Sequence, residues 1–512
     1  MNRRLSGKTD CVVVAALVLF MLAGCGGDSA PALPPDVDAP TPRAKGLSLS
    51  QVTIYQGIQI DLMANGLAIE DPPTPIAGGR ASLVRVFVTP DVGFAPRRIS
   101  ARLQLWEGTT KIVDLDSGAM IAGASTDANK ASTINFEVPG QHLRPGLRWR
   151  ASLHEEAGAA VVATGSEARS FFPERGNVAS KVLRVGDRLR LTIVPMRYTF
   201  DASNRMADTS PAALERIRVL LATLYPAPVV EVTLRAPIDI PREVRGNSTG
   251  WSDTLDALQS LRAADGAAPN VYYYGLFQPT ATFRDYCVSR RGCVVGLASV
   301  PGSAESVGRG GIGVSFPDRA DGDNWEFTLA HELGHMHGRG HAPCGLGSMV
   351  ADRAYPHEGG KIGVWGYDQR DATLIAPTAK TDFMSYCDDS WISDYTYRNL
   401  LKRMSALAAA GNALTVSDPS RWHSLRVRPR GLALGRPYTL NELPGGEAVR
   451  VERADKNGKA MDSITARFLP YDHIEGGTLF VPAEALDNVG AMSVGRHTLH
   501  LGAATTNGTA KE

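Results

Sequence analysis

The sequence predicts a multidomain protein in which a central α/β domain lies between an N-terminal β-sandwich and a small C-terminal β-domain. Three observations support this fold class. Apolar and polar residues alternate with period two from about residue 47 to 184, which is typical of strands. Strand-like and helix-like segments then alternate between about residues 187 and 277, as in α/β units. Short alternating runs return between about residues 415 and 501. We therefore expect folded domains at residues 47–185, 186–412 and 413–512.

The N-terminus has the features of an export signal. Basic residues precede an apolar run at residues 11–23, which is shorter than the 20 or so residues of a membrane span. The run ends in L-A-G-C at residues 22–25, which resembles the lipobox of bacterial lipoproteins. The resemblance implies a signal peptide at residues 1–24, a lipid on Cys25 and a location at a bacterial membrane, the outer one because Gly26 is not Asp. Alternatively, Cys25 lies near an ordinary cleavage site. A Pro-rich linker is expected at residues 25–46.

Composition describes an ordinary globular protein. The chain has 512 residues, 43% of them hydrophobic and 21% charged, with a formal net charge of +1. There is no basic excess of the kind that marks a nucleic-acid-binding protein, so we expect no nucleic-acid partner.

The first β-rich region predicts a sandwich. In the run at residues 82–88, Val84, Val86 and Val88 alternate with Arg85 and Phe87, as expected of a strand buried on one face only. Several such runs at short spacing are typical of a β-sandwich. We find no catalytic constellation in it.

The central region predicts an alternation of strands and helices. The segments are a strand at residues 189–195, a helix at 211–225, a strand at 229–234, a helix at 251–264 and a strand at 271–277. A formal G-x-G-x-x-G match at residues 308–313 precedes a strand-like V-S-F at 314–316 and not a helix, so a dinucleotide site is excluded by context. The glycines are expected to permit turns and close backbone approach.

Residues 325–341 read W-E-F-T-L-A-H-E-L-G-H-M-H-G-R-G-H and predict a metal site. A helix would place His331 and His335 side by side, four residues apart. Glu332 would lie next to them, where it could reach a water without binding the metal. Gly338 allows the sharp turn that returns His341 as a third ligand. Catalytic zinc uses three protein ligands and an open fourth position.

The motif H-E-x-x-H-x-x-G-x-x-H resembles the signature of the metzincin metallopeptidases. The resemblance implies a central metzincin-like catalytic domain, one catalytic zinc ion held by the three histidines, and Glu332 as general base. The later D-F-M-S-Y-C at residues 382–387 resembles the Met-turn of the same clan. It implies that Met384 forms an apolar floor under the metal and that Tyr386 contacts the metal or the oxyanion. A helix beginning at Ser393-Asp394 and reaching Gly411 resembles the one that closes such domains.

Four cysteines remain after Cys11 and Cys25, and an even number in an exported protein suggests disulfides. Three pairings are open. We favour Cys344 with Cys387, because both flank the proposed metal site, which leaves Cys287 to close a short loop with Cys293.

These features predict a zinc-dependent endopeptidase that acts on extracellular proteins, including glycoproteins, while anchored to the membrane through Cys25. The combination most resembles the StcE/TagA-type bacterial metalloproteases. Two alternatives remain open. One is a gluzincin-like peptidase in which Glu358 replaces His341 as the third ligand. The other is a surface adhesin whose zinc fold is inert.

Overall fold

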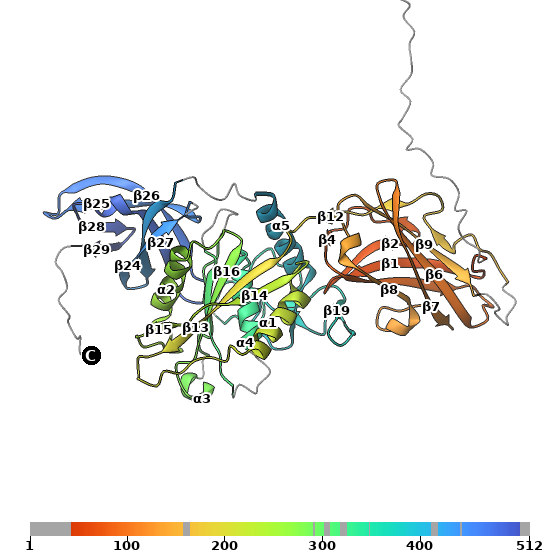
Figure 1. Ribbon diagram of the computed structural model, residues 1–512, viewed down its shortest axis with the longest axis horizontal. Helices are drawn as coiled ribbons and strands as arrows, with labels where there is room; N and C mark the ends of the chain where they lie inside the picture. Colours follow the sequence, from red (N-terminus) through yellow and green to blue (C-terminus); the bar gives the residue numbers. More distant parts are fainter. Residues whose placement is uncertain are drawn as a thin grey trace, which may run out of the picture.

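The computed structural model describes residues 42–156, 164–289, 292–301, 308–317, 325–347, 349–410, 418–440 and 443–501. The N-terminal and C-terminal β-domains lie at opposite ends of the molecule, with the central region between them (Figure 1). The expected signal peptide, Cys25 and all but the end of the expected linker fall outside the described residues. Within those residues, no helix combines the length and the apolar character needed to cross a membrane.

The N-terminal region consists of two five-stranded antiparallel sheets that share one apolar core. The first has the order β3-β2-β1-β5-β8, and the second the order β10-β9-β6-β7 with β11 also paired to β9. A short parallel pair, β4 with β12, lies beside them. The strands are β1 (Leu47–Tyr55), β2 (Gln59–Ala64), β3 (Leu67–Ala68), β4 (Ile76–Ala77), β5 (Ser82–Pro90), β6 (Arg97–Glu107), β7 (Thr110–Ile121), β8 (Ile134–Val138), β9 (Leu147–Glu155), β10 (Phe171–Phe172), β11 (Val178–Ala179) and β12 (Val182–Leu183).

Strand β5 is buried on both faces, so the expectation of a half-buried strand is wrong. Arg85, on the face expected to be exposed, is 0% exposed. Its guanidinium donates to the carbonyls of Thr126, Asp127 and Asn129 and to the Tyr55 hydroxyl. The segment that follows β7 thus covers this face of the sheet, and its carbonyls satisfy a charge that would otherwise be costly to bury.

A six-stranded sheet forms the framework of the central region, with the order β14-β13-β16-β18-β17 and with β15 also paired to β13. All pairs are parallel except β17 with β18, so β17 is an antiparallel edge strand. Short pairs follow, β19 with β20 and β21 with β22. The strands are β13 (Leu189–Tyr198), β14 (Val230–Leu234), β15 (Ile238–Ile240), β16 (Val271–Phe277), β17 (Gly296–Ala298), β18 (Gly310–Val314), β19 (Gly366–Asp368), β20 (Thr373–Ile375), β21 (Thr381–Asp382) and β22 (Ser390–Trp391).

Helices cover both faces of this sheet. Side chains from α1, α4 and α5 share a core with Tyr272 and Tyr274 of β16, whereas those of α2 pack with Tyr273 and Phe277 from the opposite face. This alternation follows from the period of two along a strand. The helices are α1 (Pro211–Leu224), α2 (Trp251–Ala264), α3 (Phe283–Tyr286), α4 (Trp325–Met336) and α5 (Asp394–Ala410).

The glycine-rich segment forms strand β18 itself and is not a turn before a strand. All five residues of Gly310–Val314 are buried. A Cβ on Gly313 would lie 2.1 Å from the Tyr274 hydroxyl, and one on Gly310 would lie 2.8 Å from Gln259 Cγ. The glycines therefore allow close packing on both faces of the strand, which is the close backbone approach that was expected.

The C-terminal region is a single seven-stranded antiparallel sheet with the order β24-β23-β27-β26-β25-β28-β29. Its two end strands, β24 and β29, contact each other, so the sheet curls round on itself. Strand β24 also contacts α2 of the central region. The strands are β23 (Ser420–Arg428), β24 (Gly431–Leu440), β25 (Glu447–Asp455), β26 (Ala460–Pro470), β27 (Gly477–Pro482), β28 (Val489–Val494) and β29 (His497–His500).

The predicted fold class, with a central α/β metzincin-like domain, is wrong. Strands account for 41% of the protein and helices for only 17%, so the fold is a β-rich multidomain one. The individual elements were well placed, since α2 and β16 have the expected bounds. The error came from giving most weight to the regular alternation before residue 277. After that residue, the described part of the chain consists mostly of strands and irregular segments, with α4 and α5 as its two long helices.

Candidate metal centre

Helix α4 carries the first two histidines of the centre. His331 and His335 lie one turn apart and are both buried. The helix ends at Met336, and Gly338 follows with a φ of +76°, which is readily adopted only by glycine. The amide of Arg339 then donates to the carbonyl of Gly334 at 3.0 Å. This turn reverses the chain and brings His341 back toward the helix.

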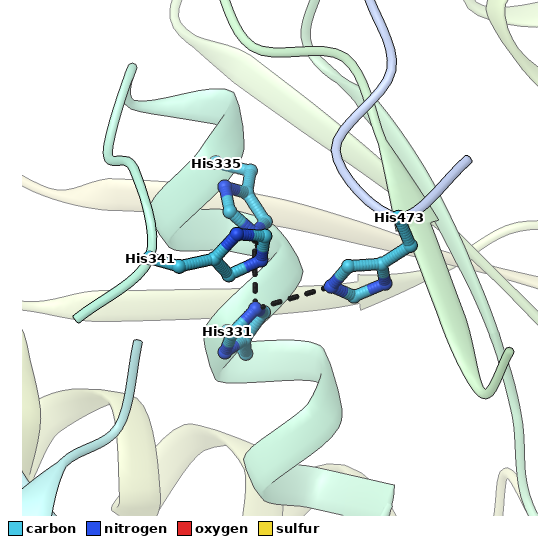
Figure 2. Close-up of side chains that lie close together, drawn as sticks. All are labelled: His331, His335, His341 and His473. Atoms are coloured by element: carbon cyan, nitrogen blue, oxygen red, sulfur yellow. Dashed lines mark hydrogen bonds between the residues drawn. The ribbon is translucent and has the colours of Figure 1, made fainter. Parts of the chain in front are cut away.

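The three imidazoles meet through their Nε2 atoms (Figure 2). His335 Nε2 lies 2.9 Å from His331 Nε2 and 3.1 Å from His341 Nε2. On the other side of each helix-borne ring, Nδ1 of His331 lies 2.8 Å from the carbonyl oxygen of Phe383, and Nδ1 of His335 lies 2.6 Å from that of Arg339. A carbonyl can only accept, so these Nδ1 atoms carry the protons and both Nε2 atoms present lone pairs.

This donor set fits a zinc ion. Tetrahedral zinc holds imidazole nitrogens at about 2.0–2.1 Å, which separates neighbouring ligand nitrogens by roughly 3.3 Å. Burial lowers the pKa of the imidazoles, to about 4 for His335 and about 2 for His341, and the neighbouring histidines lower the pKa of His331 and His341 further. The rings are therefore neutral near pH 7, as metal ligation requires. Converging lone pairs with no proton between them are stabilised by a cation.

A fourth histidine, His473, joins the cluster from the C-terminal domain. Its Nε2 lies 3.3 Å from His331 Nε2 (Figure 2). Potential ligand atoms of all four histidines lie within 4.8 Å of one another. His473 is not identifiable from the sequence, because a lone histidine in a β-rich region 132 positions beyond His341 has no motif spacing that marks it as a ligand.

The Glu332 carboxyl group lies beside the cluster and is fully buried. Its Oε1 is 3.4 Å from His473 Nδ1. It also lies against Gly296 of β17, where a Cβ would come within 2.1 Å of it. Burial and the neighbouring Asp472 carboxylate raise the pKa of Glu332 well above its usual range. The group is positioned to exchange a proton with a molecule bound at the centre.

Met384 and Tyr386 lie on the turn beneath the helix. A Cβ on Gly334 would lie 2.3 Å from Met384 Sδ, so the methionine packs directly under α4. Asp382 accepts from the Met384 amide at 2.7 Å, which shapes this turn. The Tyr386 hydroxyl lies 3.2 Å from His341 Nε2, and burial raises its pKa well above the usual value. The phenol therefore stays protonated and can donate a hydrogen bond at the centre.

The described residues contain two disulfides, with the pairing that was favoured. Cys344 joins Cys387 with a Cα–Cα distance of 5.6 Å, and Cys287 joins Cys293 at the same distance. The Tyr386 amide donates to the Cys344 carbonyl at 2.9 Å, next to the bridge. The first disulfide therefore links the segment after His341 to the turn after Met384.

Glu358, the alternative third ligand, does not join the centre. It is exposed in a short 3-10 turn, Glu358–Gly360. Among the described residues, the groups that could share an ion with His331 and His335 are His341 and His473. The gluzincin-like alternative thus lacks its ligand.

Comparison with known proteins finds a family match in this segment. Residues 299–413, which contain the three histidines of the motif, Met384 and Tyr386, match the family model Peptidase M66. A search of curated proteins finds no match. Among solved structures, one described as a chaperone-substrate complex is 13% identical with a TM-score of 0.23, and the alignment covers 54% of this chain and 39% of that one. A cycloisomaltooligosaccharide glucanotransferase from Paenibacillus sp. is 10% identical with a TM-score of 0.16, covering 89% and 72%. Neither likeness carries an argument about fold. The family match supports a metallopeptidase, which implies a metal ion, and the histidine cluster is able to bind one.

Proposed function

We propose that the chain is a zinc-dependent endopeptidase in which His331, His335 and His341 bind the metal and Glu332 is the general base. The observation that supports this most directly is the convergence of imidazole lone pairs beside a buried carboxyl group. A purely structural zinc site has no need of such a group, and an adhesin has no use for it.

Each residue of the centre has a role in peptide hydrolysis. When bound, a zinc ion would polarise the scissile carbonyl and lower the pKa of water toward about 7. Glu332 would accept the proton of the attacking water and deliver it to the leaving amine. The Tyr386 hydroxyl would donate to the oxyanion of the tetrahedral intermediate. Met384 would hold α4, and with it both helix-borne histidines, in place from below.

We further propose that the protein is exported, lipid-anchored through Cys25 to a bacterial membrane, and directed at proteins or glycoproteins outside the cytoplasm. The support is the lipobox-like L-A-G-C and the disulfides, which form in oxidising compartments. Membrane fractionation of the Cys25→Ala variant tests the anchor, and its unchanged retention in the membrane fraction would contradict it.

The function is tested by metal content and cleavage together. Purified protein is expected to hold one zinc ion and to cleave casein. A mucin is tested as a second substrate to show whether glycoproteins are cleaved. The assay should include the protein and its His473→Ala variant, since His473 contacts the cluster. Chelation and Glu332→Ala should each abolish cleavage in both backgrounds.

Two variants separate the proposal from its rivals. His341→Ala should lose zinc and activity, whereas the matched Glu358→Ala should keep both. The reverse result would restore the gluzincin-like alternative. Cleavage that survives Glu332→Ala, or equal inactivity of every form with zinc bound, would contradict the proposed function, and the latter would favour an adhesin.

A further inference from the structure

A loop of the C-terminal domain enters the candidate metal centre. It connects β26 and β27 and runs beside the edge strand β17. The Val300 amide donates to the Pro470 carbonyl at 3.1 Å, and the Asp472 amide donates to the Ala298 carbonyl at 3.3 Å. The Ala298 amide in turn donates to Asp472 Oδ1 at 3.1 Å. The loop thus uses hydrogen-bonding groups at the sheet edge nearest the centre, where an added extended segment would pair.

The loop holds the His473 ring in the tautomer of a metal ligand. Its Nδ1 donates to the Gly296 carbonyl at 2.8 Å, so Nε2 carries the lone pair. That atom points at His331 Nε2 (Figure 2). The His473 side chain is only 9% exposed. A carbonyl that fixes the far ring nitrogen is the usual support of a ligating histidine, and His331 and His335 have the same arrangement.

The neighbouring Asp472 is a second, independent indication of a cation. Its side chain is fully buried, with Oδ2 3.4 Å from His335 Nε2. Oδ2 has no hydrogen-bond partner among the described residues. Its Oδ1 accepts from the amides of Ala298 and His473, and the Glu332 carboxyl lies beside it. A buried carboxylate next to a second carboxyl group is costly, and such charges in proteins are paired or lie next to a metal. A metal ion among the histidines would supply the positive charge.

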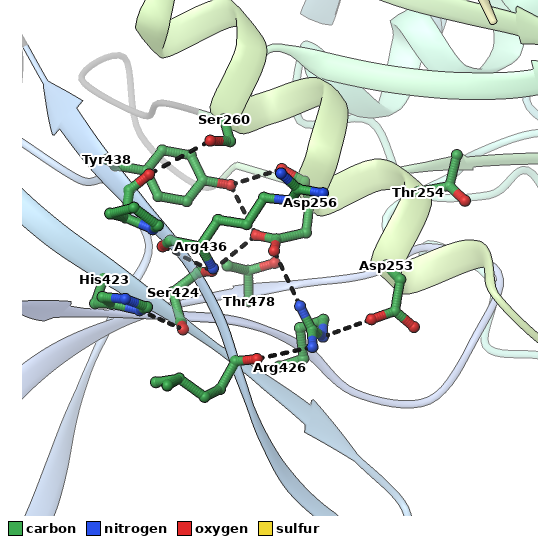
Figure 3. A network of polar contacts seen from close by, with 12 residues as sticks. Asp253, Thr254, Asp256, Ser260, His423, Ser424, Arg426, Arg436, Tyr438 and Thr478 are labelled. Carbon is green, nitrogen blue, oxygen red and sulfur yellow. Dashed lines mark hydrogen bonds and ion pairs between the residues drawn. The ribbon is translucent and has the colours of Figure 1, made fainter. Parts of the chain in front are cut away.

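A polar interface keeps this loop in place. Asp256 of α2 is fully buried and accepts from Ser424 Oγ and the Tyr438 hydroxyl, each at 2.8 Å, and from the Arg426 guanidinium at 3.0 Å (Figure 3). Arg426 also pairs with Asp253 at 3.1 Å. The C-terminal sheet is therefore docked on the central region through polar groups whose hydrogen bonds and ion pairs form only when the sheet and α2 are in contact.

We propose that His473 is a fourth nitrogen ligand of the metal and that the docked C-terminal domain holds the peptidase latent. A catalytic zinc site needs one position open to water and substrate. While the domain is docked, four imidazoles leave none, and the same loop covers the β17 edge, so the wild type cleaves only during the fraction of time that the loop has left the centre. The inference rests on the proposed function for the consequence of latency, whereas the coordination of His473 stands on the geometry alone.

Cobalt substitution tests the coordination without an activity readout. The visible spectrum of Co²⁺ reports its ligand set, and imidazole is a small probe that requires an open position. In the wild type, imidazole should leave the spectrum unchanged. In His473→Ala, imidazole should bind saturably and restore a spectrum like that of the wild type. His473→Gln can keep the hydrogen bond to Gly296 and should respond in the same way. The exposed His500→Ala, in the same domain, is the matched control and should resemble the wild type.

Metal affinity and cleavage complete the test. His473→Ala should bind zinc at least about tenfold more weakly, since even outer-shell partners of a ligand contribute about 10–100-fold. It should also cleave casein faster than the wild type, and Glu332→Ala in this background should abolish the gain. Imidazole binding to the wild type as readily as to the variants would overturn the proposal. A spectral change as expected with no cleavage in any form would confirm the fourth ligand and refute the peptidase function.

Discussion

Replacing Arg426 with alanine should loosen the docking of the C-terminal domain. The guanidinium side chain is 13% exposed and pairs with the fully buried Asp256 carboxylate at 3.0 Å. Removing one partner of a buried pair costs about 3–5 kcal/mol, because the remaining charge is left uncompensated. Asp256 keeps its bonds from Ser424 and Tyr438, so we expect the lower end, about 3 kcal/mol. Because Asp256 and Arg426 belong to different domains, this cost falls on docking.

Hydrogen exchange measures the effect directly. The amides of Ala298 and Val300 donate to residues 472 and 470 across the contact, so they exchange when the loop leaves. A loss of about 3 kcal/mol corresponds to roughly a hundredfold more frequent opening. The matched control is Arg450→Ala, whose pair with Glu452 is largely exposed and worth about 0–1 kcal/mol. If the two amides exchange equally slowly in folded Arg426→Ala and in the wild type, docking depends on other contacts and the reasoning is refuted.

Three further outcomes are expected. Gly334→Ala places a Cβ 2.3 Å from Met384 Sδ, so it should destabilise the protein by about 1–3 kcal/mol and weaken zinc binding; unchanged thermal unfolding and zinc content would show that the turn yields. The double substitution Cys344→Ser and Cys387→Ser removes a disulfide with a sequence separation of 43. It should lower the free energy of unfolding, measured with denaturant, by about 4 kcal/mol, and an unchanged midpoint of denaturant unfolding would contradict this. Chelation should lower the melting temperature, since a ligand at a thousandfold excess over its Kd stabilises the folded state by about 4 kcal/mol; equal melting with and without chelator would contradict a bound metal.

The parts of the centre that sequence analysis found are those that local geometry determines. His331 and His335 are adjacent because a helix has 3.6 residues per turn, and Gly338 allows the reversal that returns His341. The favoured cysteine pairing followed from the same local reasoning, since both residues flank the motif.

The parts that sequence analysis missed depend on contacts between distant segments. His473 reaches the centre only because a whole domain docks on α2, and a pattern within the C-terminal strands contains no information about that docking. Arg85 shows the same limit, because its burial depends on a loop that follows β7. The prediction of the fold class failed because one regular stretch of alternating strand and helix was given more weight than the strands that predominate in the regions on either side of it.

The N-terminal sandwich and the central region have a continuous apolar core. One cluster of buried side chains extends from Ile58 and Ile76 to Trp391 and Tyr397. The Trp391 indole donates to the Gly57 carbonyl at 2.8 Å, and the Arg80 guanidinium donates to carbonyls at the end of α1. These two regions should therefore unfold as one cooperative unit in calorimetry. A chain that began at residue 186 would expose the apolar surface beside the turn that carries Met384. The central region should therefore not fold stably without the N-terminal sandwich.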